Sequence, residues 1–337
     1  MKKLFLHIGT HKTGTTAIQN FAFANAERLL EMGILYPRTG RPCLNGIQTG
    51  HHLLPWTQTK HAEWKAPWGA YQSNPQTIWA NLRSEIQEST ASVAIVSSEE
   101  FDVLGAEQIG IVAEALDGFD VSVVCYLRRL DEFVQAQYAT DVVFHRETRQ
   151  IEDYLNHMRT TTDYCELINR WRSFFGERKV GVHFYLRSTL KDNDIVIDFF
   201  DRCGHDVADL RESNEPQSVN ARSEPRHVID LICMLNRANA PRKVVELFRR
   251  IASRARQEPV SGYDLLSPKK AAELADLGVR RIERLNIAGF TPEVRSAFLT
   301  SPRRDQEHWE RYAGAPFAPL RRCLEEIEAA LEGDRGK

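Results

Sequence analysis

The sequence predicts an α/β fold with three layers and a mostly parallel central sheet, followed by a helical extension. Between residues 4 and 205, short apolar runs typical of buried parallel strands alternate with segments of helical periodicity. From about Glu224, after a polar and irregular stretch, the pattern is helical without further strand-like runs. We therefore expect a core domain at 1–210 and a helical extension at 211–337 that packs on it.

The composition excludes several classes of protein. The 337 residues are 42% hydrophobic and 27% charged, with a net charge of −2, so bulk charge gives no reason to expect nucleic-acid or membrane-surface partners. The six cysteines include no C-x-x-C pair, which argues against a zinc site or disulfide framework and favours a reducing compartment. The N-terminal apolar run is too short for a signal peptide or a membrane span, and we expect a cytoplasmic protein.

The first predicted strand, at residues 4–8, leads through a glycine-bracketed turn into a helix. Gly9 and Gly14 flank this turn, and Lys12 lies within it. Such a turn is typical of a phosphate-binding loop, because glycine lets the backbone approach an anion while free N–H groups and the helix dipole face it. Lys12 adds a positive charge and the neighbouring threonines add donors. The alternative is an ordinary turn whose Gly and Thr residues only cap a helix.

The order of residues in this loop differs from that of an ATP or GTP loop. The pattern G-x-x-x-x-G-K-[ST] places Lys directly after the second Gly. Here Thr15 follows Gly14, and Lys12 stands two places before that glycine. The run Lys12-Thr13-Gly14-Thr15-Thr16 resembles the 5′-phosphosulfate loop of sulfotransferases that use 3′-phosphoadenosine 5′-phosphosulfate (PAPS).

This resemblance implies a P-loop-like fold, PAPS as the donor and adenosine 3′,5′-bisphosphate (PAP) as the product. It implies that the donor binds at Lys12, Thr13, Gly14, Thr15 and Thr16. Lys12 would also act in catalysis, by neutralising charge on the transferred group, and no metal ion is expected. The acceptor would be a hydroxyl or an amine of a small molecule or saccharide.

The next segments complete a β-α-β opening and add an irregular insert. Residues 15–32 have helical spacing, residues 34–37 read as a strand, and residues 38–76 lack periodicity. A long irregular segment with several Trp and His side chains is typical of a functional loop that could take a saccharide, although a surface loop pinned by aromatic contacts explains it equally well. A metal site at His51-His52 is not expected, since no carboxylate or Cys stands at ligand spacing.

A helix at residues 78–87 and a buried strand at 92–98 precede Glu99. A carboxylate just past the end of a central strand lies where open α/β sheets bind ligands. In heparan-type sulfotransferases a Glu at the corresponding strand end is the base, so the resemblance implies that Glu99 takes the acceptor proton. Glu100 is the second carboxylate candidate, and a histidine of the 51–52 pair, His52, is the runner-up. The alternative is that Ser98 caps a helix and acidic residues follow in its first turn.

The second half of the resemblance follows a helix at residues 105–116 and a strand at 120–127. Sulfotransferases hold the 3′-phosphate of PAPS with a strand-end Arg and with a Ser and a Tyr on the next helix, and Arg128 and Tyr138 match the Arg and the Tyr. The Ser position is Ala136, so one donor is missing, and the contact could shift to Gln135, Gln137 or Arg129. The alternative for Arg128 is a salt-bridged strand end.

The remaining segments carry weaker functional signals. Residues 206–226 are polar and resemble the family's stretch that closes over the adenosine end of the donor, which makes Arg222 a candidate binding residue; a plain linker is the alternative. The other expected elements are helices at 131–144, 151–158, 163–175, 195–202, 228–236, 244–251 and 320–331, one starting at 267–268, and a strand at 179–186.

Three functions stay open from the sequence. The first is a PAPS-dependent sulfotransferase. The second is a nucleoside-triphosphate kinase or NTPase, which requires a Lys directly after Gly14 and an acidic strand end for Mg²⁺. The third is a catalytically degenerate binding module of the same fold, which Ala136 favours and Lys12 and Glu99 oppose. The sequence leaves the acceptor and the oligomeric state open.

Overall fold

The computed structural model of the protein describes residues 1–41, 49–58, 75–158, 163–213, 226–254 and 265–300. The chain divides into two compact units that interleave along the sequence. Unit 1 comprises Met1–Arg128, Asp163–Asn220 and Arg281–Val294, and unit 2 comprises Arg129–Thr162, Ala221–Arg280 and Arg295–Lys337. The predicted division into 1–210 and 211–337 follows chain order, whereas Arg129–Thr162 groups with helices that come much later.

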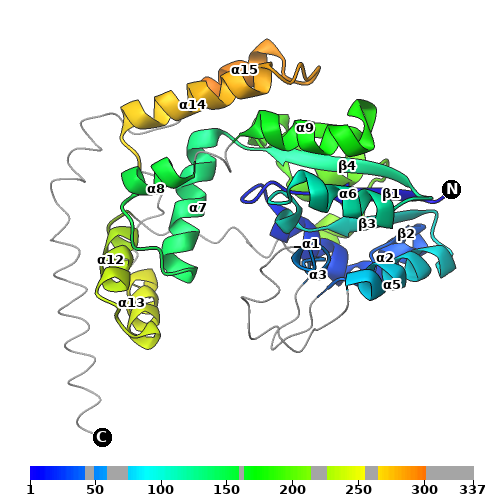
Figure 1. Cartoon of the computed structure of the whole chain (residues 1–337), viewed down its shortest axis with the longest axis horizontal. Helices are drawn as coiled ribbons and strands as arrows, with labels where there is room; N and C mark the ends of the chain where they lie inside the picture. Colours follow the sequence, from blue (N-terminus) through cyan, green and yellow to red (C-terminus); the bar gives the residue numbers. More distant parts are fainter. Residues whose placement is uncertain (42–48, 59–74, 159–162, 214–225, 255–264, 301–337) are drawn as a thin grey trace, which may run out of the picture. The chain divides into compact units, whose positions relative to one another are not determined.

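Unit 1 contains a five-stranded sheet in the order β2-β3-β1-β4-β5, and every pair of neighbouring strands is parallel (Figure 1). In the central register, His7 at the end of β1 lies opposite Ser97 in β3 and Val124 in β4. The α/β fold with a parallel central sheet is thereby confirmed. The strands are β1 (Lys3–His7), β2 (Ile34–Leu35), β3 (Val93–Ser97), β4 (Asp120–Leu127) and β5 (Val180–Phe184).

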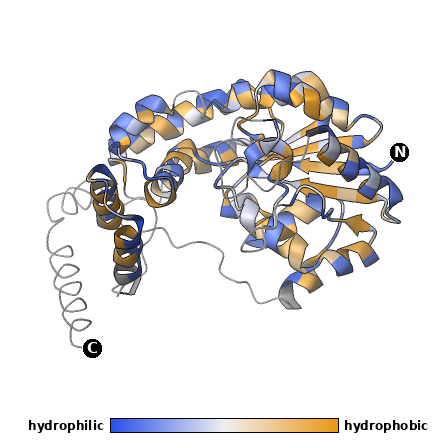
Figure 2. Cartoon of the chain, turned by 60° about the horizontal axis from the view of Figure 1, so that its bottom comes forward, coloured by the Kyte–Doolittle hydropathy of each residue, from blue (hydrophilic) through white to orange (hydrophobic). Residues whose placement is uncertain are grey.

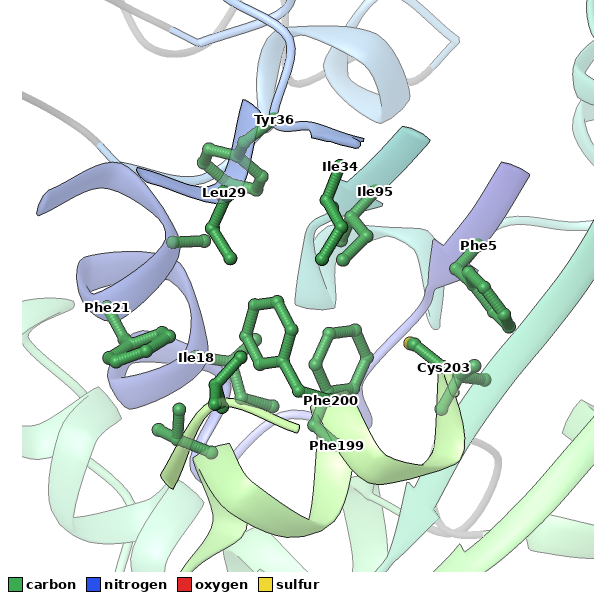
Figure 3. Close-up of a cluster of buried hydrophobic side chains, with 14 of the residues drawn as sticks. Phe5, Ile18, Phe21, Leu29, Ile34, Tyr36, Ile95, Phe199, Phe200 and Cys203 are labelled. Atoms are coloured by element: carbon green, nitrogen blue, oxygen red, sulfur yellow. The ribbon is translucent and has the colours of Figure 1, made fainter. Parts of the chain in front are cut away.

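One face of the sheet is covered by helices α1 (Thr15–Ala24), α2 (Ala26–Glu31) and α10 (Ile195–Arg202). Aromatic side chains fill the space between these helices and the strands, as Figure 3 shows for Phe5, Phe199 and Phe200. Phe21 of α1 meets Phe200 edge to face, with ring centroids 5.4 Å apart. Burial of this cluster fixes α1, and therefore the loop before it, on the sheet.

The opposite face is covered by α6 (Ala106–Ala115) and α9 (Tyr164–Phe175), which pack on each other, and α9 also packs on β4 and β5 (Figure 1). Trp171 of α9 is fully buried and meets Phe101 edge to face at 6.1 Å. The strands between the two helical layers are almost uniformly hydrophobic in Figure 2, as expected for a sheet buried on both faces. Unit 1 also contains α3 (Leu53–Trp56), α5 (Pro75–Glu88), α11 (Ala208–Ser213) and the short 3-10 helices η2 (Glu99–Phe101), η3 (Glu177–Lys179), η4 (Arg187–Thr189) and η5 (Lys191–Asn193).

Unit 2 is helical in its described part. Its core joins Tyr138 and Val142 to side chains of much later helices, among them Ile232 and Phe248. Among the described residues of the whole chain, no helix combines the length and the apolar character that crossing a membrane requires. The helices are α7 (Leu130–Phe144), α8 (Ile151–His157), α12 (Arg226–Arg237), α13 (Arg242–Arg254), α14 (Pro268–Glu283) and α15 (Pro292–Leu299), the last two of which cross the boundaries between units.

Two expectations from the sequence need correction, and a third concerns residues outside the described part of the chain. The helix predicted at 15–32 is two helices, because the Asn25 side chain donates to the carbonyl of Phe21 at 2.9 Å and ends α1 there. The predicted irregular segments at 38–76 and 206–226 contain α3 and α11, helices of 4 and 6 residues that are too short to show periodicity. The helix expected at 320–331 lies outside the described residues.

Candidate functional site

The strand order has a topological switch point at the carboxyl ends of β1 and β4, where an open α/β sheet is expected to form a crevice. From β1 the chain continues towards β2, whereas from β4 it continues towards β5 on the other side of the sheet. In open α/β sheets ligands bind at such a reversal, because neighbouring connections leave the sheet in opposite directions. The predicted phosphate loop follows β1, and Arg128 directly follows β4, so both lie at this crevice.

The loop between β1 and α1 has left-handed backbone at three positions. Gly9, Lys12 and Gly14 have φ angles of 91°, 62° and 81°. A Cβ added to Gly14 would lie 3.1 Å from side-chain atoms of both Tyr185 and Ile195, so a larger residue would force these side chains to shift. Glycine is required at this position both for its φ angle and for this close packing.

Backbone contacts tie the loop to the end of β4. The N–H of Thr10 donates to the carbonyl of Tyr126 at 3.0 Å, and the Thr13 hydroxyl donates to the carbonyl of Thr10 at 2.5 Å. Arg128 Nη1 donates to the carbonyl of Lys12 at 2.9 Å. Arg128 and the loop that carries Lys12 are therefore direct neighbours, whereas the Thr13 hydroxyl is used inside the loop.

The N-terminus of α1 opens on this loop without a side-chain cap. Its N-cap residue is Gly14, whose carbonyl accepts from Ala17 at 2.9 Å. The Thr15 hydroxyl is buried and has no hydrogen-bond partner in the described part of the chain, and Thr16 is exposed. Free N–H groups, the helix dipole and an unsatisfied hydroxyl make this terminus suitable for an anion.

Glu99 lies against the loop, as predicted for the base. A Cβ added to Gly9 would lie 3.1 Å from Glu99 Cα, so the two backbones touch. Glu99 Oε2 accepts from Gln19 Nε2 at 3.0 Å and lies 4.0 Å from His52 Nδ1. Burial alone would raise the pKa of Glu99, but the charges of His52 and His11 and the Gln19 hydrogen bond outweigh burial and lower it.

Ser98 makes the cap contact that the structural alternative for Glu99 requires. The Ser98 hydroxyl accepts from the N–H of Glu100 at 3.2 Å at the start of η2. The backbone of Glu99 thus belongs to a capped helical turn, while its carboxylate faces Gln19 and His52. The capping interpretation of the Ser98-Glu99-Glu100 run is therefore confirmed for the backbone, and the role of the Glu99 carboxylate as a base stays a prediction.

The two histidines of the insert differ in their surroundings. His51 Nδ1 accepts from the N–H of Ser97 at 3.1 Å, and its Nε2 donates to the carbonyl of Pro37 at 3.0 Å. Burial lowers the pKa of His51 to about 3, so this ring is a neutral structural group. His52 Nδ1 lies 2.8 Å from Ser98 Oγ, and the ring stacks on Trp56 with centroids 5.5 Å apart. His52 and Glu99, the two predicted bases, are thus neighbours.

Sequence reasoning missed three side chains near the loop. The guanidinium carbon of Arg128 lies 5.5 Å from the ring centre of Tyr185, which follows β5 directly; inspection of every strand end would have found this tyrosine. Gln19 of α1 donates a hydrogen bond to the Glu99 carboxylate. Asp102 Oδ2 accepts from His11 Nδ1 at 2.8 Å, and no motif in the sequence marks that pair.

The other predicted binding residues are not tested by these contacts. The Tyr138 hydroxyl donates to the carbonyl of Arg149 at 2.9 Å within unit 2. Gln135 Oε1 accepts from the N–H groups of Leu265 and Leu266, so it is engaged in packing. Arg222 lies outside the described residues. The roles of Tyr138 and Arg222 stay predictions.

Comparison with known proteins gives distant similarities. No protein-family profile matches the chain. Over 120 residues, 35% of this chain, it is 29% identical to an uncharacterised protein of Archaeoglobus fulgidus, and the match spans 32% of that relative, about a third of its length. The chain is similar to the crystal structure of a sulfotransferase from Alicyclobacillus acidocaldarius with a TM-score of 0.41 and 14% identity, over 91% of this chain and 98% of the other.

Proposed function

We propose that the protein transfers a sulfuryl group from PAPS to a hydroxyl or amine of an acceptor and releases PAP. The observation that carries this proposal is the meeting of three groups at one crevice. The loop of Lys12 and the side chain of Arg128 are joined by a hydrogen bond of 2.9 Å, and Glu99 lies against Gly9 of the same loop. The loop and the strand-end arginine suit a nucleotide donor with two anionic groups, and the carboxylate suits a proton acceptor.

The donor would bind through its 5′-phosphosulfate at the loop. Its oxygens would accept hydrogen bonds from the first N–H groups of α1 and from the buried hydroxyl of Thr15, which is otherwise unsatisfied. Lys12 would supply a positive charge at the same place. Arg128 would hold the 3′-phosphate, a group that PAPS has and ATP lacks, with Tyr138 and Arg222 as further predicted contacts.

The reaction would be an in-line displacement at sulfur. The acceptor oxygen or nitrogen forms a bond to sulfur while the bond from sulfur to the bridging oxygen breaks, and its electron pair stays on the phosphate of PAP. Glu99 takes the proton of the acceptor, which its ionised state allows, and His52 is the second candidate for this step. Lys12 and the N–H groups of α1 stabilise the charge that develops on the bridging oxygen.

The acceptor would bind beside Glu99. His52 and Trp56 stack beside Glu99, and both belong to the insert at 38–76, for which the sequence left a saccharide-binding loop and a surface loop as equal alternatives. Trp56 is itself 8% exposed, so its ring mainly supports His52. Residues 59–74 lie outside the described part of the chain. A saccharide or another small polar acceptor stays our proposal.

Calorimetric titration with PAP, ADP and magnesium-ATP tests the donor. We expect the wild type to bind PAP and to bind ADP much more weakly. Arg128→Ala should weaken PAP binding at least tenfold. Arg170→Ala, at a half-buried arginine of α9 that is paired with Glu166, should not weaken it. Since Arg128 also supports the carbonyl of Lys12, 5′-AMP serves as the reference ligand, and the loss for PAP should exceed the loss for 5′-AMP.

The same titration, together with an assay of sulfuryl transfer, distinguishes the two alternative functions. A preference for magnesium-ATP over PAP would replace this proposal with the kinase or NTPase. Binding of PAP without any sulfuryl transfer to acceptors would indicate the degenerate binding module.

A further inference from the structure

The phosphate loop carries a second basic side chain, His11, directly before Lys12. One carboxylate oxygen of Asp102, Oδ2, accepts from the backbone N–H of His11 at 2.9 Å and lies 2.8 Å from its Nδ1. The Asp102 side chain is 9% exposed and that of His11 is 23% exposed. A largely buried carboxylate therefore fixes both the backbone and the ring of His11, while part of the ring stays accessible at the loop.

The charges around His11 come from the segment after β3. Asp102, Glu99 and Glu100 all favour the protonated ring. Burial opposes protonation, but the ion pair and hydrogen bond to Asp102 outweigh it, and together they raise the pKa of His11 to about 9. An imidazole that is protonated at neutral pH cannot accept a proton, so His11 is excluded as the base. It can act as a cation.

We propose that His11 is a second cationic group of the phosphate loop, held in place by Asp102, and that it stabilises the negative charge of the donor. This inference rests on the proposed function. Without the imidazolium, the loop would bring an anionic donor beside the carboxylates of Asp102 and Glu99, and both would repel it. When His11 is protonated, the His11–Asp102 pair carries no net charge. The positive charge of Lys12 and the helix dipole at the N-terminus of α1 then determine the electrostatic potential that the donor meets. Nδ1 is committed to Asp102, and Nε2 makes no hydrogen bond to any described residue.

Binding of PAP to full-length variants tests this role between pH 7 and 10. At pH 7.5 we expect His11→Asn to weaken the binding of PAP about tenfold or more. The wild-type affinity should fall as pH rises through about 9, where His11 loses its proton, and His11→Asn should lack this phase. Lys12 is present in both proteins, so the difference between their profiles isolates His11. The matched control is His145→Asn, which removes another pair with Nδ1 at 2.8 Å from an aspartate, Asp141, but in unit 2.

Two further variants keep the test decisive if His11→Asn does not fold. His11→Arg keeps a permanent charge, so it should bind PAP at pH 7.5 within a few-fold of the wild type and lose the phase near pH 9. Asp102→Asn removes the group that raises the pKa of His11, so burial then dominates and the phase should move below pH 7. If the His11–Asp102 pair had a purely structural role, the PAP affinity of the wild type would show no fall near pH 9, and Asp102→Asn would shift none.

The outcomes separate this inference from the proposed function. Failure of the wild type to bind PAP at any pH overturns the proposed function. Binding by the wild type with equal affinity and an equal pH profile in His11→Asn overturns the inference alone.

Discussion

The side-chain amide of Gln19 donates a hydrogen bond of 3.0 Å from Nε2 to Oε2 of Glu99. Gln19 lies on α1, the helix whose N-terminus faces the phosphate loop, and Glu99 follows β3. Gln19 is 2% exposed, and a Cβ added to Gly50 would lie 2.6 Å from its amide, so the amide has little room to turn. The helix that we propose binds the donor at its N-terminus therefore also orients the proposed base.

We predict that Gln19→Met raises the pKa of Glu99. Burial already favours the neutral carboxyl, and the variant removes one of the interactions that favour the charged form. The base is active only when ionised, so the acid limb of the kcat/KM profile should move to higher pH, with KM for the donor nearly unchanged. A profile that keeps its acid limb while activity falls would show that Glu99 is not the base.

Replacement of Lys12 should abolish transfer without unfolding the protein. We expect Lys12→Ala to lower kcat about 10²- to 10³-fold, because the developing charge on the leaving phosphate loses its counter-charge. Lys12→Arg should retain part of the activity. Melting temperatures compared with Lys191→Ala, an exposed lysine paired with Asp201, would exclude a folding defect. Full activity in Lys12→Ala would refute the mechanism.

Gly14→Ala should destabilise unit 1 more than the same change at another left-handed glycine. Gly14 and Gly204 have nearly equal φ angles, 81° and 85°, so the backbone cost of alanine is similar, about 1 kcal/mol. A Cβ at Gly14 meets Tyr185 and Ile195 at 3.1 Å, whereas a Cβ at Gly204 meets nothing within 4 Å. Urea unfolding should therefore show an additional loss of about 1–3 kcal/mol for Gly14→Ala. Equal losses would mean that the packing around Gly14 is loose.

The elements that the sequence predicts best have a strong local signal. The strand predicted at 120–127 is β4 with the same bounds, because a continuous apolar run specifies a buried parallel strand. The positions of Arg128 and Glu99 at the crevice followed from one topological rule, that ligands bind at the carboxyl ends of parallel strands. Tyr185 obeys the same rule, and periodicity within β5 did not single it out.

The rest of the site depends on contacts between distant parts of the chain. His11 and Asp102 are 91 residues apart, and Gln19 and Glu99 are 80 apart, so no local pattern links either pair. The grouping of Arg129–Thr162 with later helices likewise comes from packing, since Tyr138 and Val142 find their apolar partners about a hundred residues further on. In a single sequence such pairings leave no signal, because the fold alone brings the partners together.

Acid should destabilise the protein through histidines that are buried in the neutral form. Burial lowers the pKa of His7 to about 4, of His51 to about 3 and of His183 to about 4, from 6.5 in the unfolded chain. Below pH 6.5 the unfolded state binds more protons than the folded state, so the stability present above that pH is lost as pH falls towards 4. Each histidine contributes a slope of up to about 1.4 kcal/mol per pH unit to the free energy of unfolding.

Urea titrations at pH 7 and pH 5 would measure this loss. His51→Gln removes one titrating group, so its stability should depend less on pH by up to about 1.4 kcal/mol per unit, although the variant is less stable at pH 7 because the contacts to Ser97 and Pro37 are disturbed. His145→Gln, at an exposed histidine, is the matched control. If His51→Gln and the wild type lost stability in parallel, protonation of His51 would not be part of acid unfolding, and the buried ring would already be compensated by its two backbone partners.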